Sequence, residues 1–179
     1  VQLGVNKIIA DKIGLKNTKI LSPKTHLLKK LYTYVPAKNR DNLLNALFQA
    51  GAGNISNYSE CSFSTEGLGT FKGNEKSTPY LGEINKRSAE LEQKVEVIFP
   101  AYLASKIVKT LKANHPYEEV AYEIITLDNA YQEVGSGMIG ELEKPMAEKE
   151  FLTFLKHKMK TKCIRHTALL KKKIKKVAV

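Results

Sequence analysis

The sequence predicts an α/β protein whose middle part is a ferredoxin-like (α+β) sandwich. Residues 30–37 and 94–101 share one pattern of alternating residues that ends in Pro-Ala, at an offset of 64 residues. Each copy continues into an amphipathic stretch, a turn and a second strand, which holds Tyr58 in the first copy and Tyr122 in the second. Strand–helix–strand written twice is typical of the split β-α-β sandwich.

The elements expected before the repeat are a helix and a short strand. Residues 5–13 are predicted to be helical, and Gly14 follows at the position where helices commonly end in a residue with left-handed backbone conformation. Residues 18–21 are expected to form a strand that ends at residues 22–24. One apolar face of the helix is expected to hold Val5, Ile8, Ile9 and Ile13.

The first copy of the repeat is expected to contain a strand at 30–35 and a helix at 38–50, with Pro36 at the turn, where its missing N–H costs nothing. Between the copies we expect a long strand at 54–64 and a returning strand at 67–71. The polar connection that follows is long for a compact fold, which favours a role in function or assembly. The inward helix positions are Leu43, Leu44, Leu47 and Phe48.

The second copy, residues 94–127, closes the sandwich, and four further elements are expected after it. A glycine-rich strand is predicted at 135–142 and a helix at 147–159, followed by a strand at 163–167. Residues 174–179 have the short β-branched pattern of a buried parallel strand. Because such a strand needs neighbours on both sides, we expect the chain to be a fragment of a longer protein. The inward face of the helix is expected to hold Phe151, Phe154 and Leu155.

The net charge of +11 is concentrated at one end of the chain. Ten of the 29 basic residues and none of the 18 acidic residues follow Glu150. Basic stripes can bind phosphate backbones, but these lysines alternate with apolar positions and no aromatic stacking platform accompanies them. A solvated face, or one covered by a missing acidic part, is therefore favoured over a nucleic-acid site.

Cysteine usage and hydropathy indicate the compartment. Cys61 and Cys163 are the two cysteines, and they form neither a disulfide framework nor a metal knuckle. No apolar run approaches the roughly 18 residues that span a bilayer. These features favour the cytoplasm and no membrane partner.

The candidate catalytic residues are few. His115, Glu118 and Glu119 could supply metal ligands or acid–base groups. Alternation along a strand would place the two glutamates on opposite faces, and a turn at His115-Pro116 is the favoured interpretation. Arg165 and His166 could line a phosphate or substrate pocket, although a surface or packing role is favoured.

Four segments together closely resemble a known protein family. They are residues 51–73, residues 115–122, Val35-Pro36 and residues 135–140. The family is the dinuclear metal centre, hexameric family, often labelled GTP cyclohydrolase I type 2 homologue or NGG-interacting factor three-like. The chain looks most like its bacterial long form, in which a PII/CutA-like domain interrupts an α/β metal-binding core.

The resemblance implies three parts. Residues 1–26 would end the first half of the core, residues 27–128 would form the ferredoxin-like insert, and residues 129–179 would begin the second half. The metal ligands of the family are histidines and carboxylates that match no residue here. The resemblance therefore implies two divalent metal ions in the full-length protein and none bound by this chain alone.

The resemblance implies that the full-length protein is a metal-dependent, hydrolase-type protein with an unsettled substrate. The fragment alone would be inactive, and whether the full-length protein is an enzyme stays open. The alternative is a regulatory or oligomerisation module that binds a small effector through its PII-like domain. The expected partner is the protein itself, as a hexamer or trimer of dimers. A third interpretation, nucleic-acid binding through the basic end, fits the family loosely.

Overall fold

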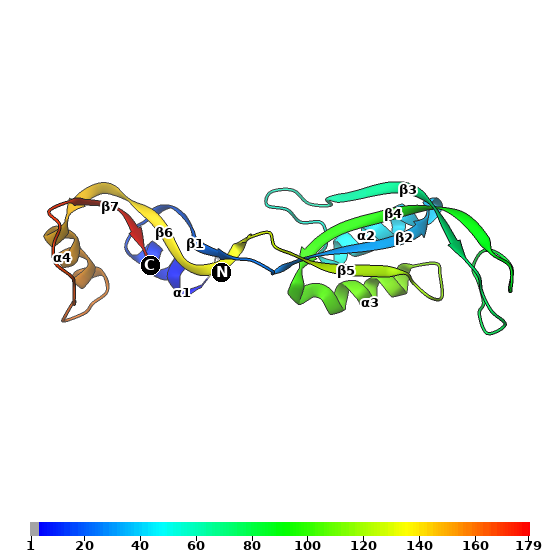
Figure 1. Cartoon of the computed structure of the whole chain (residues 1–179). Helices are drawn as coiled ribbons and strands as arrows, with labels where there is room; N and C mark the ends of the chain where they lie inside the picture. Colours follow the sequence, from blue (N-terminus) through cyan, green and yellow to red (C-terminus); the bar gives the residue numbers. More distant parts are fainter. Residues whose placement is uncertain (1–3) are drawn as a thin grey trace. The chain divides into compact units, whose positions relative to one another are not determined.

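A computed structural model describes residues 4–179 of the chain. The chain divides into two compact units, one formed by Thr25–Asn129 and the other by the residues on either side of it (Figure 1). We call them the central unit and the flanking unit. Both are mixed α/β structures with an antiparallel sheet, which agrees with the α/β class expected from the sequence.

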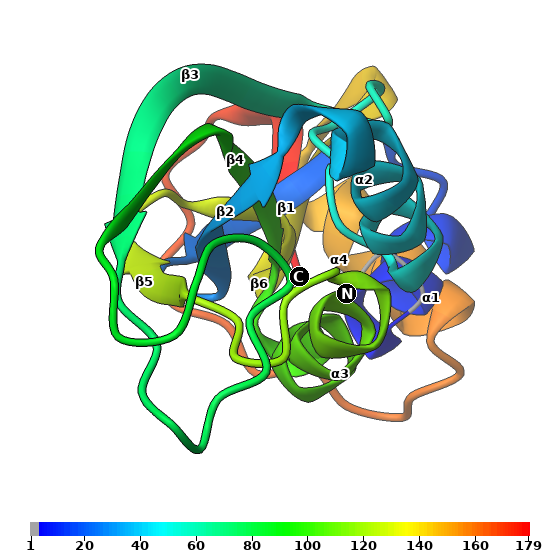
Figure 2. The same ribbon diagram turned by 90° about the vertical axis from the view of Figure 1, so that its right-hand side faces the viewer.

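The central unit is a four-stranded sheet with strand order β3-β4-β2-β5, in which every neighbouring pair is antiparallel. Helices α2 and α3 contact each other and lie together on one side of this sheet (Figure 2). This is the order and direction of a split β-α-β sandwich. Its elements are β2 (Leu28–Pro36), the 3₁₀ turn η1 (Ala37–Asn39), α2 (Arg40–Ala50), β3 (Ser62–Phe71), β4 (Ser88–Pro100), the 3₁₀ turn η2 (Ala101–Leu103), α3 (Ala104–Asn114) and β5 (Tyr122–Leu127).

The internal repeat survives in three dimensions. Strands β2 and β4, which carry the two copies of the repeated pattern, are neighbours, paired from Leu28 opposite Pro100 to Pro36 opposite Glu92. Each strand ends in proline and continues through a 3₁₀ turn into a helix. Proline suits this place because its ring fixes φ and because it has no N–H that would need a hydrogen-bond partner where the strand ends. The core between sheet and helices contains Leu31, Val35, Leu43, Leu47, Val95, Val97, Phe99, Ile107 and Leu111.

The predicted strand at 54–64 is wrong over residues 54–61, and residues 67–71 form a strand as predicted but not one that returns. Residues 54–61 form a loop with one isolated bridge between Ile55 and Tyr58. The residues read as a returning strand belong to β3 itself, and the strand that returns is β4. At the edge of the sheet, β3 tolerates Gly67 and Gly69 without a break, so these glycines do not mark a turn.

The flanking unit contains a three-stranded antiparallel sheet with order β1-β6-β7. Of the residues predicted to share the inner face of α1, Ile13 is buried, whereas Val5 and Ile8 are exposed. Ala10 takes the buried position instead. The elements are α1 (Val5–Lys12), β1 (Lys16–Lys24), β6 (Tyr131–Ala147), α4 (Glu148–Lys158) and β7 (Lys173–Ala178), and the core contains Ala10, Ile13, Leu15, Leu142 and Phe151.

Two predictions for this unit are wrong. Residues 163–167 form no strand; the Thr161 hydroxyl donates to the Cys163 carbonyl at 2.9 Å at the start of an irregular segment. β7 is antiparallel to β6 and lies at an edge of the described sheet, not buried between parallel strands. A short β-branched run indicates a strand but not the direction of its partner, because direction depends on the chain that connects them.

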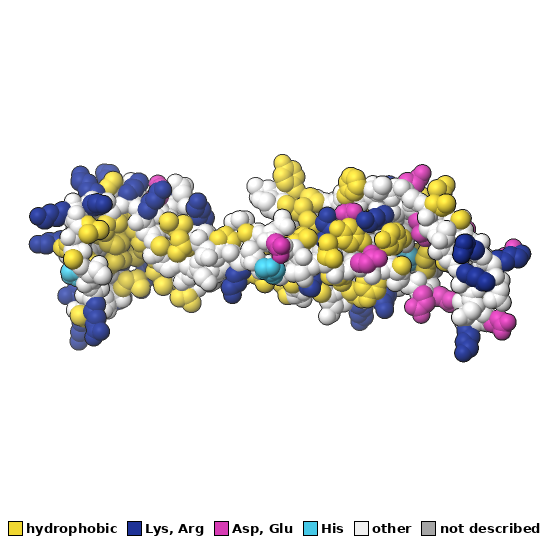
Figure 3. Space-filling view, viewed as in Figure 1, with side chains coloured by type: hydrophobic (Ala, Val, Ile, Leu, Met, Phe, Trp, Pro, Cys, Tyr) yellow, Lys and Arg dark blue, Asp and Glu magenta, His cyan; other side chains and the backbone are white. Residues whose placement is uncertain are grey.

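Lysine and arginine side chains gather on the part of the flanking unit that holds α4 (Figure 3). Both cysteines are free. Within residues 4–179, no helix combines the length and the apolar character needed to cross a membrane.

Candidate functional site: a cavity in the central unit

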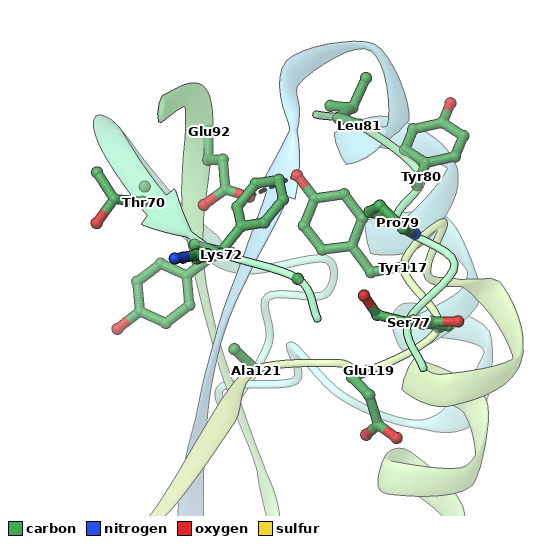
Figure 4. A pocket seen from close by; sticks show the side chains of 15 residues that line it. Thr70, Lys72, Ser77, Pro79, Tyr80, Leu81, Glu92, Tyr117, Glu119 and Ala121 are labelled. Carbon is green, nitrogen blue, oxygen red and sulfur yellow. Dashed lines mark hydrogen bonds between the residues drawn. The ribbon is translucent and has the colours of Figure 1, made fainter. Parts of the chain in front are cut away.

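A cavity of about 470 Å³ lies in the central unit, near the place where Pro36 of β2 pairs with Glu92 of β4 (Figure 4). Its size is in the range of small-molecule sites. Three segments supply most of its walls: the end of β3, the loop between β3 and β4, and residues 117–121 after α3. One residue each of β2 and β4 completes them. Its walls are Tyr34, Gly69, Thr70, Phe71, Lys72, Gly73, Ser77, Pro79, Tyr80, Leu81, Glu92, Tyr117, Glu118, Glu119 and Ala121.

Local hydrogen bonds shape the loop between β3 and β4. The Asn85 N–H donates to the Gly73 carbonyl at 2.8 Å and closes the loop. Inside it, the Ser77 hydroxyl donates to the Asn74 carbonyl at 2.6 Å. The Thr78 N–H donates to Glu118 Oε1 at 2.8 Å, which ties the loop to residues 115–121 across the cavity. The long polar connection identified in the sequence is therefore a wall of the cavity.

His115 holds residues 115–121 against the sheet. Its ring is buried, with Nε2 2.9 Å from the Tyr34 carbonyl and Nδ1 accepting the Tyr117 N–H at 3.2 Å. The neutral tautomer with hydrogen on Nε2 satisfies both contacts. Burial lowers the pKa of His115, opposed by the Tyr34 hydrogen bond and the Glu92 charge. His115 is thus engaged on both nitrogens and lies outside the cavity wall.

Acidification is expected to destabilise the central unit through His115. Because the pKa of His115 is lower in the folded chain, the unfolded chain takes up the proton first as the pH falls below about 6.5. The stability associated with His115 is thus present at neutral pH and lost on acidification. Denaturation from about pH 7 to pH 5 should show a smaller loss of stability in His115→Gln than in the wild type. His157→Gln, at an exposed position on α4, is the matched control and should follow the wild type; equal pH slopes in all three proteins would contradict the assignment.

Buried Glu92 and half-buried Tyr117 form a hydrogen-bonded pair within the cavity. The Tyr117 hydroxyl donates to Glu92 Oε1 at 2.7 Å, as the dashed line in Figure 4 marks. Burial, and then the hydrogen bond and charge of Glu92, raise the pKa of Tyr117. The phenol therefore keeps its proton and serves as the donor. Gly69 makes room for this pair, since a Cβ there would overlap Glu92 Oε2.

Aromatic rings surround the Glu92–Tyr117 pair. The rings of Phe71 and Tyr80 are tilted by 51° and 52° to the Tyr117 ring, with centroids 6.4 and 6.0 Å away. Lys38 Nζ lies 5.1 Å from the centroid of the Tyr80 ring, so a cation already contacts this aromatic group. The tilted rings form a corner and not a parallel slot.

The structure brings together two of the five candidate residues. Glu118 and Glu119 both line the cavity and are exposed. The prediction that they point to opposite faces of a strand is wrong, because residues 116–121 form no strand. Arg165 and His166 are exposed in the irregular segment after α4, where His166 Nδ1 is 2.7 Å from the Thr167 carbonyl, and neither lines the cavity.

The residues that sequence reasoning missed are Glu92, Tyr117, Phe71 and Tyr80. Tyr117 stands in a segment that carried the family resemblance, and a tyrosine beside two glutamates was a usable signal. Glu92 gave none, because a glutamate within a strand is normally a solvated position. Its burial depends on Gly69, which lies in another strand.

The described residues do not fit a dinuclear metal centre. In residues 4–179, no three His, Cys, Asp or Glu side chains converge in a group that could hold a metal ion. His26 Nε2 and Asp128 Oδ1 are 2.9 Å apart, but both side chains are largely exposed and they provide a pair only. A two-metal site needs several such ligands around metal ions about 4 Å apart.

The fold and cavity define a mixed α/β protein with two antiparallel sheets and a ligand-sized cavity in its central unit. The chain belongs to the Duf34/NIF3 (NGG1p interacting factor 3) family, whose model matches residues 1–179. The resemblance inferred from the sequence is thereby confirmed.

Relatives agree over nearly the whole chain. A GTP cyclohydrolase 1 type 2 homolog of Bacillus subtilis is 38% identical over 177 residues, which cover 98% of this chain and 48% of the relative. A Bacillus cereus protein related to NIF3 is 38% identical with a TM-score of 0.80, covering 98% of this chain and 46% of that one. Staphylococcus aureus SA1388 is 26% identical with a TM-score of 0.60, covering 98% and 44%. The chain spans about half the length of the curated relatives it matches.

Proposed function

We propose that the central unit is a regulatory module that binds a small organic molecule in the cavity between β3, its following loop and residues 115–121. The observation that carries this function is the cavity itself, about 470 Å³ with a buried carboxylate and four aromatic rings on its walls. A few polar groups among mostly aromatic and aliphatic ones are typical of sites for small molecules.

An NMR screen of small organic molecules against this chain tests the proposal. Molecules that bind are expected to shift the amide signals of the cavity walls. Gly69→Ala is expected to weaken their binding about tenfold, because the new Cβ displaces Glu92. Gly67→Ala is the matched control in the same strand, since its Cβ would meet nothing within 4 Å. Retained sheet signals show that both variants fold. Hits that map elsewhere, or that bind both variants equally, would contradict the proposal.

For the whole protein we propose a metal-dependent, hydrolase-type function with two divalent metal ions. Membership of the Duf34/NIF3 family and the name of the curated relatives support it. The metal ligands would come from residues outside this chain, because the described residues do not converge in such a group. Metal analysis of this chain beside a protein of the relatives' full length tests the proposal; equal metal content in the two would overturn this placement of the ligands.

The proposed arrangement is a PII/CutA-like unit inserted into an α/β metal-binding core. The full-length protein would be cytoplasmic and would assemble with copies of itself, as a hexamer or trimer of dimers. The strand order of the central unit and its position between two halves of the flanking unit support the insertion. The free cysteines favour a reducing compartment. Light scattering of the full-length protein tests the assembly.

A further inference from the structure

Glu92 is a buried carboxylate without a cationic partner. It is 9% exposed, and its Oε1 accepts a hydrogen bond from the neutral Tyr117 hydroxyl. Among the described residues, no lysine, arginine or histidine nitrogen lies within 4.0 Å of its oxygens. A buried carboxylate compensated by one neutral donor is costly to maintain, and a ligand that carries a positive charge would remove much of that cost.

The cavity around Glu92 also favours positive charge. Glu92, Glu118 and Glu119 line it against Lys72 alone, so the formal charge of its walls is −2. The faces of aromatic rings attract cations, and the tilted rings of Phe71 and Tyr117 border this space beside the Tyr80 ring, which Lys38 Nζ already contacts. An anionic ligand would meet both the carboxylates and the negative ring faces.

We propose that the ligand of this cavity is an organic amine, with an ammonium group at Glu92 Oε2 and an apolar or aromatic body against Phe71, Tyr80 and Tyr117. The inference rests on the proposed small-molecule function of the central unit and names its ligand class. The carboxylate supplies a charge-assisted hydrogen bond, which is stronger than a neutral one. The cavity is larger than an ammonium group needs, which leaves room for the body.

Three probes of similar size and different charge test the inference. They are 2-phenylethylamine, 2-phenylethanol and 3-phenylpropionate, titrated at neutral pH while the amide signals of the cavity walls are followed by NMR. The amine is expected to bind about tenfold more tightly than the alcohol, and the carboxylate most weakly of the three. Glu92→Gln keeps an acceptor for Tyr117 but removes the charge, and it should remove the preference for the amine while leaving the affinity for the alcohol unchanged. Glu123→Gln, at an exposed position in β5 outside the cavity, should bind all three probes as the wild type does.

The outcomes separate this inference from the function on which it rests. Equal binding of amine and alcohol, or an amine preference that survives Glu92→Gln, would overturn the ligand class while small-molecule binding stands. Preference for the propionate would overturn it in the same way. If none of the three probes binds, the ligand class is overturned, and the wider screen then decides whether the cavity binds any small molecule.

Discussion

Replacing Phe99 with alanine is expected to lower the free energy of unfolding of the central unit by about 3–5 kcal/mol. Phe99 is 0% exposed and belongs to the core cluster between the sheet and the two helices. It lies in β4, one of the two central strands, which is paired on both sides, so the backbone around the ring has little freedom to close the space that the ring leaves. Truncation removes the transfer free energy of the ring and adds a cavity term, which is why the expected loss is large.

Phe63→Ala is the matched control for this experiment. Phe63 lies in β3 and is 64% exposed, so the same truncation should change stability by only about 0.5 kcal/mol. Denaturant titrations followed through the amide signals of β2 and β4 would report this unit separately from the flanking one. A similar loss of stability in the two variants would contradict the assignment of Phe99 to the core.

Replacing Gly135 with alanine is expected to destabilise the flanking unit by about 1–3 kcal/mol. Gly135 pairs with Pro23, and a Cβ at this position would overlap Ile20 Cγ2 and the carbonyl oxygen of Ser22. A flexible side chain can move away from such an overlap, but a backbone carbonyl within β1 cannot move without disturbing the pairing with β6. The variant should show faster amide hydrogen exchange along β1 and β6.

Gly67→Ala again provides the comparison. Gly67 is also a strand glycine, yet its Cβ would meet nothing within 4 Å, and the substitution reduces the freedom of the unfolded chain. Its stability is expected to remain within about 0.5 kcal/mol of the wild type or to rise slightly. If hydrogen exchange in β1 and β6 is unchanged in Gly135→Ala, the close contact with Ser22 is not a determinant of this sheet.

The site was less accessible to sequence reasoning than the fold. Glu118 and Glu119 were identified as candidates for acid–base or metal chemistry, although the strand predicted there would have placed them on opposite faces. The cavity they line depends on Phe71, Tyr80 and Glu92, which come from two strands and a loop. No spacing in the sequence relates Glu92 to Tyr117, 25 residues later, because their hydrogen bond forms only when the segment after α3 returns to the end of the sheet.

The sequence by itself determined the repeated strand–turn–helix of the central unit. Apolar alternation sets β2 and β4, helical periodicity sets α2 and α3, and proline at positions 36 and 100 sets the turn between them. All these signals are local, so they can be read without knowing the neighbours. The tertiary structure alone decided that β3 is one continuous edge strand, that β7 pairs antiparallel with β6, and that Glu92 is buried. Strand partners and burial depend on which distant segments pack together. The local sequence does not specify those segments, because backbone pairing and hydrophobic contact can form with many partners.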